Sequence, residues 1–472
     1  MTHEFDRLYI GGQWRKASTS ERIEVRSPAD RSYVGSTVRA TVADVDAAVV
    51  AARSAFDHGE WPHLSLDDRL AVLTRMRDHL DSRLAELDEL GTRENGVTIA
   101  VRPGLRGVEL FDFTLAAARE YVFETERAAL GKSGTVVREP LGVVAAIVAS
   151  NGPLLQSVAK VAPALAAGCT VVLKPPAETP LIVLALAEAA HAAGLPAGVL
   201  NVVPGDVVEG QHLVAHPGVD ALTFTGSAAA GRQIAAAAGG NLTRTTLELG
   251  GKSAGVVLAD ADLEAAAATI AMGCMAFSGQ RCAAISRAFV PADRYDEALA
   301  AIVGAVAALP IGDPLEAGTF IGPLVSQRGL DRVADYVDGA VADGAILALG
   351  GHRIAGRDGY YFEPTVLTKV TNDMRIAREE VFGPVLCVLP YDALEDAVAM
   401  ANDNDYGLTA SVFSADRAAA EQVARRIRAG SIGINAAAGA IGLPFGGYKA
   451  SGHGREYSIE AFDDFTEIKA IA

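Results

Sequence analysis

The sequence has few basic side chains, few cysteines and no long apolar run. Its 472 residues carry 41 Lys and Arg against 58 Asp and Glu, which leaves a formal net charge of −17. Nucleic-acid binding depends on Lys and Arg that neutralise phosphates, so this balance argues against a nucleic-acid partner. The apolar runs at residues 143–149 and 180–190 are too short for a membrane span. We therefore expect a soluble protein with no membrane partner.

The N-terminal segment also lacks the marks of a signal peptide. Residues 1–7 are mixed and acidic, with no basic stretch followed by an apolar one. The chain contains no CxxC and no HExxH, and it has only four cysteines: Cys169, Cys274, Cys282 and Cys387. Neither a disulfide framework nor a zinc site is expected from this pattern. We predict a cytoplasmic protein that holds no metal.

The hydrophobic pattern predicts an α/β protein. From residue 143 onward, short continuous apolar runs alternate with segments of helical spacing, which is typical of βαβ units. Strands of this kind imply a parallel sheet covered by helices on both faces. The predicted strands cover residues 143–149, 169–173, 199–203 and 221–225, and the predicted helices cover residues 156–168, 179–193 and 228–239.

A second series of the same kind begins at residue 253. Asp260 or Asp262 is the predicted N-cap of an apolar helix that runs to about residue 277. The other expected elements of this series are strands at 253–258, 285–290, 365–367 and 385–389 and helices at 296–308 and 329–343. Two such series predict two large α/β domains that meet near residue 250. Residues 124–139 and 462–472 fit neither core, so we expect them to form a β arm that pairs with another subunit.

Two side chains stand where chemistry is expected. Cys282 lies in a polar, glycine-containing loop directly after an apolar helix, beside Arg281. A buried structural thiol is the plainer interpretation, but this position also suits an accessible thiol with a lowered pKa. Glu248 ends an apparently buried strand, just before Gly250 and Gly251. It is either a capping or salt-bridged residue, or a general base whose pKa is raised by desolvation.

A third pattern favours anion binding. Gly226, Ser227 and Gly231 lie at a predicted strand-to-helix turn, where backbone N–H groups can approach an anion at a helix N-terminus. The pattern is not GxGxxG, and alone it is a weak signal because many such turns need glycine. The Gly-Lys-Ser at residues 251–253 is not a P-loop, since Thr246 stands where the first glycine of that motif belongs.

Taken together, these motifs resemble the aldehyde dehydrogenase superfamily in order and spacing, over nearly the whole chain. The segments that carry the resemblance are Asn151, Lys174, Phe224-Thr225-Gly226-Ser227, Glu248-Leu249-Gly250-Gly251-Lys252, Gly279-Gln280-Arg281-Cys282, Glu380-Val381-Phe382-Gly383-Pro384 and Pro444-Phe445-Gly446-Gly447-Tyr448-Lys449. The resemblance implies NAD(P)-dependent, non-acylating oxidation of an aldehyde to a carboxylic acid.

The resemblance assigns the catalytic roles. Cys282 attacks the aldehyde, and the Asn151 amide with the cysteine's own backbone N–H stabilises the oxyanion. After hydride transfer, Glu248 activates the water that hydrolyses the thioester. Lys160 and Glu456 match positions that form a proton relay or an alternative base in some members. An ordinary structural ion pair is an equal alternative for these two.

The resemblance also assigns cofactor and substrate contacts. Lys174 would bind the adenosine ribose of NAD, Glu380 the nicotinamide ribose, and Ser227 the pyrophosphate. The implied cofactor site comprises Val148, Ser150, Lys174, Ala177, Gly226, Ser227, Gly231, Leu249, Glu380 and Phe382. The implied substrate tunnel comprises Gly152, Gln156, Ala159, Arg281 and Phe445.

The sequence departs from the family pattern near both ligands. Many members have a Trp before the asparagine and an aromatic residue after it, whereas this chain has Ser150 and Gly152. With Ala159 also small, we expect a wide tunnel suited to bulky aliphatic, terpenoid or aromatic aldehydes. Ala177 occupies the position of a ribose-binding Glu, and Glu178 follows it. We expect NAD as cofactor, with NADP use possible.

The predicted architecture is a Rossmann-like cofactor domain, an α/β catalytic domain and a small oligomerisation arm. The cofactor domain comprises residues 1–123 and 141–249, the catalytic domain 250–455, and the arm 124–140 and 456–472. The arm implies a homodimer or a homotetramer. Two other functions remain open: a CoA-acylating dehydrogenase, which often lacks the general-base glutamate, and a catalytically idle binding or structural relative, which need not retain Cys282, Glu248 and Asn151 together.

Overall fold

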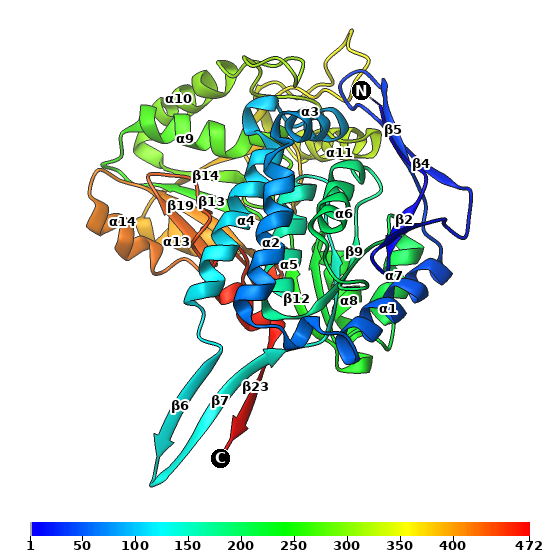
Figure 1. Cartoon of the computed structure of the whole chain (residues 1–472). Coiled ribbons are helices and arrows are strands. Elements are labelled where there is room, and N and C mark those ends of the chain that lie inside the picture. The colour runs from blue at the N-terminus through cyan, green and yellow to red at the C-terminus, as the bar shows by residue number, and fades with distance from the viewer. Residues whose placement is uncertain (1) are drawn as a thin grey trace.

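A computed structural model describes residues 2–472 of the chain. Two α/β units form the body, and a narrow β arm projects from it (Figure 1). The predicted fold class is therefore confirmed. None of the helices in the described part of the chain is both long and apolar enough to cross a membrane.

The first unit is built on an eight-stranded sheet of order β22-β12-β11-β8-β9-β10-β2-β3. Strands β8 to β12 are parallel, and β8 lies between β11 and β9. The chain therefore leaves β8 first toward β10 and later toward β12, and this reversal opens a crevice at the carboxyl ends of the strands. The strands are β2 (Leu8–Ile10), β3 (Gln13–Arg15), β8 (Val143–Ile147), β9 (Thr170–Lys174), β10 (Leu200–Val202), β11 (Ala221–Thr225), β12 (Arg244–Glu248) and β22 (Gly452–His453).

Helices cover both faces of this sheet, as the buried strands require. One core contains α2 (Leu66–Asp81), α3 (Leu84–Asn95), α4 (Pro103–Glu120), α5 (Pro153–Ala167) and α6 (Leu181–Ala193). The opposite core contains α1 (Val42–Asp57), α7 (Val207–Ala215) and α8 (Ala228–Asn241). A separate small sheet of order β1-β5-β4 is formed by β1 (His3–Phe5), β4 (Arg22–Arg26) and β5 (Tyr33–Val38).

The second unit has a seven-stranded sheet of order β15-β16-β17-β14-β13-β19-β20. All neighbours are parallel except β15, and the chain again starts in the middle, at β13. The strands are β13 (Ser253–Val257), β14 (Ile285–Pro291), β15 (Ile346–Leu349), β16 (Thr365–Thr368), β17 (Val385–Tyr391), β19 (Thr409–Phe413) and β20 (Ser431–Ile434).

Helices α9 (Leu263–Met275) and α10 (Tyr295–Ala307) cover one face of this second sheet. The other face is covered by α11 (Gln327–Ala342), α12 (Arg375–Arg378), α13 (Leu394–Asn402) and α14 (Arg417–Ala424). Asp262 is the N-cap of α9, and its side chain accepts a hydrogen bond from the backbone N–H of Ala265 at 3.2 Å. A short pair, β18 (Tyr406–Gly407) and β21 (Tyr448–Lys449), lies beside the main sheet.

The arm is a three-stranded antiparallel sheet of order β23-β7-β6. It consists of β6 (Glu124–Ala129), β7 (Lys132–Pro140) and β23 (Thr466–Ile471), and it extends away from both units (Figure 1). Residues just before β23 belong to the body: Phe462 and Phe465 are buried in the core of the first unit. Glu456 is buried too and contacts Lys160 of α5. The predicted arm boundary at residue 456 is therefore too early, because this segment packs on α5 before the chain reaches β23.

Candidate active site

The carboxyl ends of the first sheet's parallel strands and the amino ends of strands in the second sheet face one cavity of about 450 Å³. Loops after β8, β11 and β12 contribute one side, and the loop before β14 and the loop after α12 contribute the other. Eight of the residues predicted for the site border this cavity: Ser150, Asn151, Gly226, Ser227, Leu249, Cys282, Glu380 and Phe382.

Cys282 is presented by a tight turn after α9. Phe277 and Ser278 have left-handed φ values of 57° and 56°, and Gly279 follows with φ 72°. A Cβ at Gly279 would lie 2.0 Å from the carbonyl oxygen of Gly383, so only glycine fits there. The Ser278 hydroxyl donates a hydrogen bond of 2.8 Å to the Gly322 carbonyl. The turn leaves Cys282 partly exposed, while the other three cysteines are buried as expected.

The expectation of a lowered pKa for Cys282 is wrong. Burial raises the pKa of the thiol well above its ordinary value, and the charges of Glu248 and Glu380 raise it further. Arg281 opposes the shift but does not outweigh these causes. The thiol is therefore protonated at neutral pH and needs a base to become a nucleophile.

Asn151 is held by a chain of hydrogen bonds that begins at Gln156. The backbone N–H of Ala149 donates to Gln156 Oε1 at 2.9 Å, and Gln156 Nε2 donates to Asn151 Oδ1 at 2.8 Å. Asn151 Nδ2 then donates to the carbonyl of Gln280, two residues before Cys282, at 2.9 Å. These contacts fix which end of the Asn151 amide is the donor, and they leave its second N–H free. Gln156, predicted as a tunnel wall, contacts Asn151 instead.

Glu248 is buried at the end of β12. Only 4 % of its surface is exposed, and Oε1 has no hydrogen-bond partner among the described residues. Burial raises its pKa well above the ordinary value, as expected, and the charge of Glu456 adds to this effect. A carboxyl group in this state can accept a proton near neutral pH.

Lys160 and Glu456 form a buried ion pair next to Glu248. Lys160 Nζ donates to Glu456 Oε1, while Glu456 Oε2 has no partner in the described part of the chain. Both charges act on Glu248, Glu456 raising its pKa and Lys160 lowering it. The structure thus brings the three side chains together, in agreement with either a relay or a structural pair.

The double glycine after β12 lets Glu380 approach the cavity. A Cβ at Gly250 would lie 2.4 Å from Glu380 Oε2, and the backbone N–H of Gly251 donates to Glu380 Oε1 at 3.1 Å. Arg332 of α11 donates hydrogen bonds to the carbonyls of Glu380 and Val381. Burial raises the pKa of Glu380 to about 7. Its carboxyl group is therefore an acceptor aimed into the crevice.

The N-terminus of α8 opens into the same cavity. Ser227 is its N-cap and accepts a hydrogen bond from the backbone N–H of Ala230 at 3.2 Å. A Cβ at Gly231 would lie 2.5 Å from Leu249 Cδ1, so α8 packs closely against the loop after β12. This arrangement offers backbone N–H groups and the positive end of a helix dipole to an anion.

Lys174 lies at the end of β9, away from the cavity lining. Its side chain is buried, Nζ donates to the Pro175 carbonyl at 3.2 Å, and burial lowers its pKa. The charges of Asp206, Glu178 and Glu209 favour its ammonium form. Among the other predicted cofactor contacts, Val148 is buried and Ala177 is half-buried, and neither lines the cavity.

Some cavity residues were missed from the sequence. The start of α11 contributes Ser326, Arg328 and Arg332, and the loop after β9 contributes Glu178. Arg328 pairs with Glu178 at 3.0 Å across the cavity. The sequence does show polar residues 326–328 just before the predicted helix at 329–343. No pattern in one sequence, however, shows that this helix faces the first sheet.

The predicted tunnel residues lie on two sides of Cys282. Phe445 stacks on Tyr457 with ring centroids 5.3 Å apart, and Cys282 packs against this pair. Gly152 borders an apolar hollow of about 30 Å³ beside Asn151, with Phe277 on its wall. Ala159 is buried in the core of the first unit, so the structure assigns it packing contacts.

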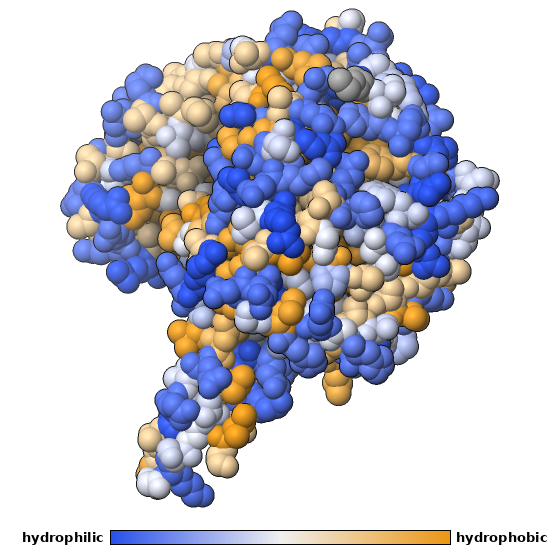
Figure 2. Space-filling model, in the orientation of Figure 1, coloured by the Kyte–Doolittle hydropathy of each residue, from blue (hydrophilic) through white to orange (hydrophobic). Residues whose placement is uncertain are grey.

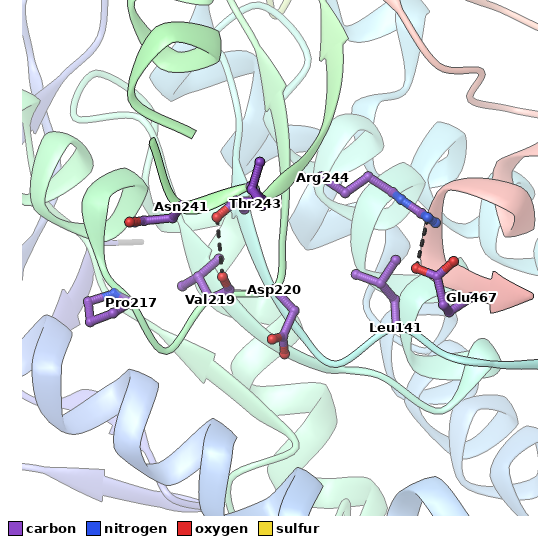
Figure 3. Close-up of a pocket in the computed structure, with 9 residues that line it drawn as sticks. Leu141, Pro217, Val219, Asp220, Asn241, Thr243, Arg244 and Glu467 are labelled. Atoms are coloured by element: carbon purple, nitrogen blue, oxygen red, sulfur yellow. Dashed lines mark hydrogen bonds and ion pairs between the residues drawn. The ribbon is translucent and has the colours of Figure 1, made fainter. Parts of the chain in front are cut away.

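A larger hollow of about 550 Å³ lies at the base of the arm (Figure 3). Its lining includes Asp220, Asn241 and Arg244, and Arg244 pairs with Glu467 of β23 at 2.8 Å. None of its lining residues is a Cys, Ser or His, so this hollow offers no thiol and no imidazole base.

Asp46, His212 and His216 are the three-residue cluster in the described chain that could hold a metal ion. His212 Nε2 contacts Asp46 Oδ1 at 2.5 Å, and His216 Nε2 lies 3.5 Å from the same oxygen. The backbone N–H of Gly218 donates to His216 Nδ1 at 3.0 Å. Because Nδ1 of His216 accepts this hydrogen bond, the proton of its neutral ring is on Nε2. Nε2 therefore faces Asp46 as a hydrogen-bond donor and is not free to bind a metal ion.

Comparison with known proteins finds relatives that match this chain over nearly its whole length. The sequence is 42 % identical over 475 positions to geranial dehydrogenase of Castellaniella defragrans, covering 100 % of this chain and 99 % of the relative. It is 42 % identical to 3-succinoylsemialdehyde-pyridine dehydrogenase of a Pseudomonas species, covering 99 % and 98 %. The crystal structure of Mycobacterium tuberculosis aldehyde dehydrogenase complexed with NAD+ superposes with a TM-score of 0.98, at 45 % identity, over 100 % of this chain and 98 % of that one.

The profile of the aldehyde dehydrogenase family matches residues 14–471, which is nearly the whole chain. Five of the motifs that carried the resemblance, those at residues 151, 224–227, 248–252, 279–282 and 380–384, contribute to one cavity between the two sheets. The chain belongs to the aldehyde dehydrogenase family.

Proposed function

We propose that this protein oxidises an aldehyde to a carboxylic acid with NAD, using Cys282 as nucleophile. The observation that carries the proposal is one cavity that contains Cys282 and Asn151, with Glu248 buried beside the thiol. The same cavity reaches the N-terminus of α8 and Glu380, where a dinucleotide fits. A catalytically idle relative has no need to keep all these groups around one crevice.

The residues around the crevice fit NAD. The α8 N-terminus at Ser227 would hold the pyrophosphate, Lys174 the adenosine ribose, and Glu380 the nicotinamide ribose, with Phe382 beside it. The predicted contacts Val148, Ser150, Ala177, Gly226 and Leu249 lie in the loops that follow β8, β9, β11 and β12, and Gly231 lies in the first turn of α8. When bound, NAD supplies the acceptor for hydride.

Proton transfers and charge stabilisation fall to this chain's own residues. Glu248 is the carboxylate that shares a hydrogen bond with the thiol, and we assign it the proton of Cys282 before attack and later the proton of the hydrolytic water. The free N–H of Asn151 and the backbone N–H of Cys282 stabilise the oxyanion of the adduct. The adduct loses hydride and becomes a thioester on Cys282. Lys160 and Glu456 carry protons between Glu248 and solvent.

Hydrolysis is favoured over transfer to CoA because Glu248 is in place. Its unpartnered Oε1 and raised pKa suit the activation of water beside the thioester. A CoA-acylating enzyme has no need for this base. The expected product is therefore a free acid.

NAD is favoured over NADP by the charges near Lys174. Asp206, Glu178 and Glu209 surround this lysine. The arginines nearest them are already neutralised, Arg39 by Glu209 at 3.2 Å and Arg328 by Glu178 at 3.0 Å. A 2′-phosphate would therefore meet carboxylates without a free guanidinium.

The substrate we propose is a bulky aliphatic, terpenoid or aromatic aldehyde. Gly152 leaves room beside Asn151, since the nearest atom to a Cβ there would be Gln156 Nε2 at 3.6 Å. A Gly152→Phe variant should lose rate on citral and keep it on propanal. Unchanged relative rates would show that residue 152 does not set substrate size.

A homodimer or homotetramer is proposed from the arm. Both outer strands of its sheet, β6 and β23, have unpaired edges, and Ile468 and Ile471 are exposed. In Figure 2 hydrophobic and hydrophilic residues are interspersed along the arm, as expected of a surface that a second copy covers. Free thiols at all four cysteines support a cytoplasmic location.

The test is NAD(P)H formation at 340 nm with aliphatic, aromatic and terpenoid aldehydes, each with NAD and with NADP. Cys282→Ala should abolish activity, while Cys274→Ala, which removes a buried thiol elsewhere in the same unit, should retain it. Activity that persists in Cys282→Ala would overturn the mechanism. No activity of the wild type on any aldehyde would favour the idle relative.

A further inference from the structure

Asn95 is the last residue of α3, and its side chain reaches the loop that carries Asn151. It is buried, it borders the same small hollow as Asn151, and its Nδ2 donates a hydrogen bond to the carbonyl of Ser150. The backbone N–H of Val97 donates to Asn95 Oδ1 at 3.1 Å. Both ends of the amide are therefore in use, and these two contacts fix which end faces the Ser150 carbonyl.

The carbonyl that Asn95 binds belongs to the peptide group that joins Ser150 to Asn151. The hydroxyl of Thr179 also donates to it, at a longer distance of 3.4 Å. A carbonyl held by side chains from two other segments cannot turn freely, because turning would leave buried donors without an acceptor. The direction in which the Asn151 side chain leaves the backbone thus depends on Asn95.

The end of α3 is itself held in place by the start of α6. The carboxyl group of Glu94 accepts hydrogen bonds from the backbone N–H groups of Leu181 and Ile182, both at 3.0 Å. Only 1 % of the surface of Glu94 and 3 % of that of Asn95 is exposed. Because Glu94 precedes Asn95 directly, this contact leaves the Asn95 amide little freedom to move.

The turn that follows α3 also touches the segment that anchors the loop of Cys282. Gly96 has a left-handed φ of 82°, and a Cβ there would lie 2.8 Å from Pro323 Cγ. A Cβ at Gly322 would lie 2.4 Å from the carbonyl oxygen of Gly96, so the two backbones are in close contact. The carbonyl of Gly322 in turn accepts the hydrogen bond of the Ser278 hydroxyl, in the tight turn before Cys282.

The end of α3 is therefore linked to both loops that supply oxyanion donors, the amide of Asn151 and the backbone N–H of Cys282. We propose that Asn95 is a positioning residue that acts through Asn151, by holding the peptide before it so that the free N–H of the Asn151 amide points at the oxyanion. A shift of about 1 Å in such a group can cost 10²-fold in rate. The inference rests on the proposed function, since the oxyanion belongs to the adduct on Cys282.

The experiment replaces Asn95 by leucine, which has a similar shape and no hydrogen-bonding group. Asn95→Leu should lower kcat about tenfold and change KM for the aldehyde and for NAD less than about threefold. In an Asn151→Ala background the same substitution should cause no further loss, because no amide is left to orient. Losses that add in the double variant, or an unchanged kcat in Asn95→Leu, would overturn the proposal. Asn95→Ala takes the same test if the leucine variant does not fold.

Asn201 of β10 provides the matched control. It is a buried asparagine whose Oδ1 accepts from the backbone N–H of Gly11 at 2.8 Å and whose Nδ2 donates to the carbonyl of Gly198 at 2.8 Å. Asn201→Leu loses the same kinds of hydrogen bond away from the cavity, so it should lower Tm and leave the kcat of the folded enzyme unchanged. An equal loss of kcat in the two variants would show that general damage to the first unit slows the reaction, and would overturn the proposal.

An ester substrate separates this inference from the proposed function. 4-Nitrophenyl acetate acylates a thiol through an oxyanion adduct and releases 4-nitrophenolate, with no hydride transfer. The rate of this release without NAD should fall about tenfold in Asn95→Leu and stay unchanged in Asn201→Leu. Such a fall in a protein whose wild type forms no NADH with any aldehyde would refute the proposed oxidation and leave the role of Asn95 standing. NADH formation by the wild type, with release unchanged in Asn95→Leu, would refute the role of Asn95 alone.

Discussion

Gln156 shows how one side chain can set the orientation of another at the reacting centre. The amide of Asn151 has one end that accepts and one that donates, and Gln156 Nε2 fixes the accepting end at 2.8 Å. Without this bond the Asn151 amide can rotate and offer its oxygen to the oxyanion, which is repulsive. Gln156 is therefore a positioning residue that acts through Asn151.

Gln156→Met should lower kcat by about tenfold, less than the ~10²–10³ expected for loss of an oxyanion donor in Asn151→Ala. KM should change little, and the double variant should be no slower than Asn151→Ala. Steady-state kinetics with alkylation of Cys282 as a check on folding measure this. Additive losses in the double variant would show that Gln156 acts independently of Asn151.

The raised pKa of Glu248 predicts the sign of the pH dependence. Only the carboxylate can take a proton from water, and burial holds the group protonated to a pH well above its ordinary range. The rate of hydrolysis should therefore rise with pH through this raised pKa and be lost as pH falls below it. A rate that falls with rising pH over the same interval would contradict this assignment.

Glu248→Gln should lower kcat by roughly 10²–10⁴ and remove the rising limb of the pH profile. Glu178→Gln is the control, since it makes the same change at a carboxylate that borders the cavity but pairs with Arg328. It should keep the limb. A limb that survives in Glu248→Gln would assign it to another group, with Glu380, whose pKa is about 7, the first to examine.

At the scale of elements, helix α8 offers two glycines with opposite surroundings. A Cβ at Gly231 would lie 2.5 Å from Leu249, whereas a Cβ at Gly239 would meet nothing within 4 Å. Gly231→Ala should push α8 away from the loop after β12, lower Tm and raise KM for NAD. Gly239→Ala should stabilise the protein by about 0.5–1 kcal/mol, because Gly costs this much in a helix. Thermal unfolding and NAD titration measure both, and equal effects would contradict the close packing.

The strands of the two α/β units were predictable from the sequence where a continuous apolar run marks each strand. The apolar runs that become β8, β9, β11 and β13 are buried at every residue, and the predicted bounds differ from the observed ones by a residue or two. Sheet order is a matter of distant contacts, so the pairing of β22 with β12 was not foreseen. The same holds for Gln156, whose two hydrogen bonds depend on how α5 sits against the loop after β8.

At the scale of the whole molecule, the β arm of a single chain has two strand edges with no neighbouring strand among residues 2–472, those of β6 and β23. Every residue of β6 is exposed, and β23 keeps only one neighbour, β7. Open strand edges with apolar side chains tend to pair with other chains. The pairing of β23 with β7 within one chain gives a platform that a second copy can extend.

Ile468→Asp combined with Ile471→Asp should therefore reduce the oligomer to a monomer, because two charges would enter the surface that the copies bury. Sedimentation velocity of wild type and variant measures the change. Val50→Asp is the control, since Val50 is an apolar residue of α1 that is 64 % exposed on the body of the molecule. It should leave the assembly intact. Wild-type protein that sediments as a monomer, or an oligomer that survives the double substitution, would show that the arm does not hold copies together.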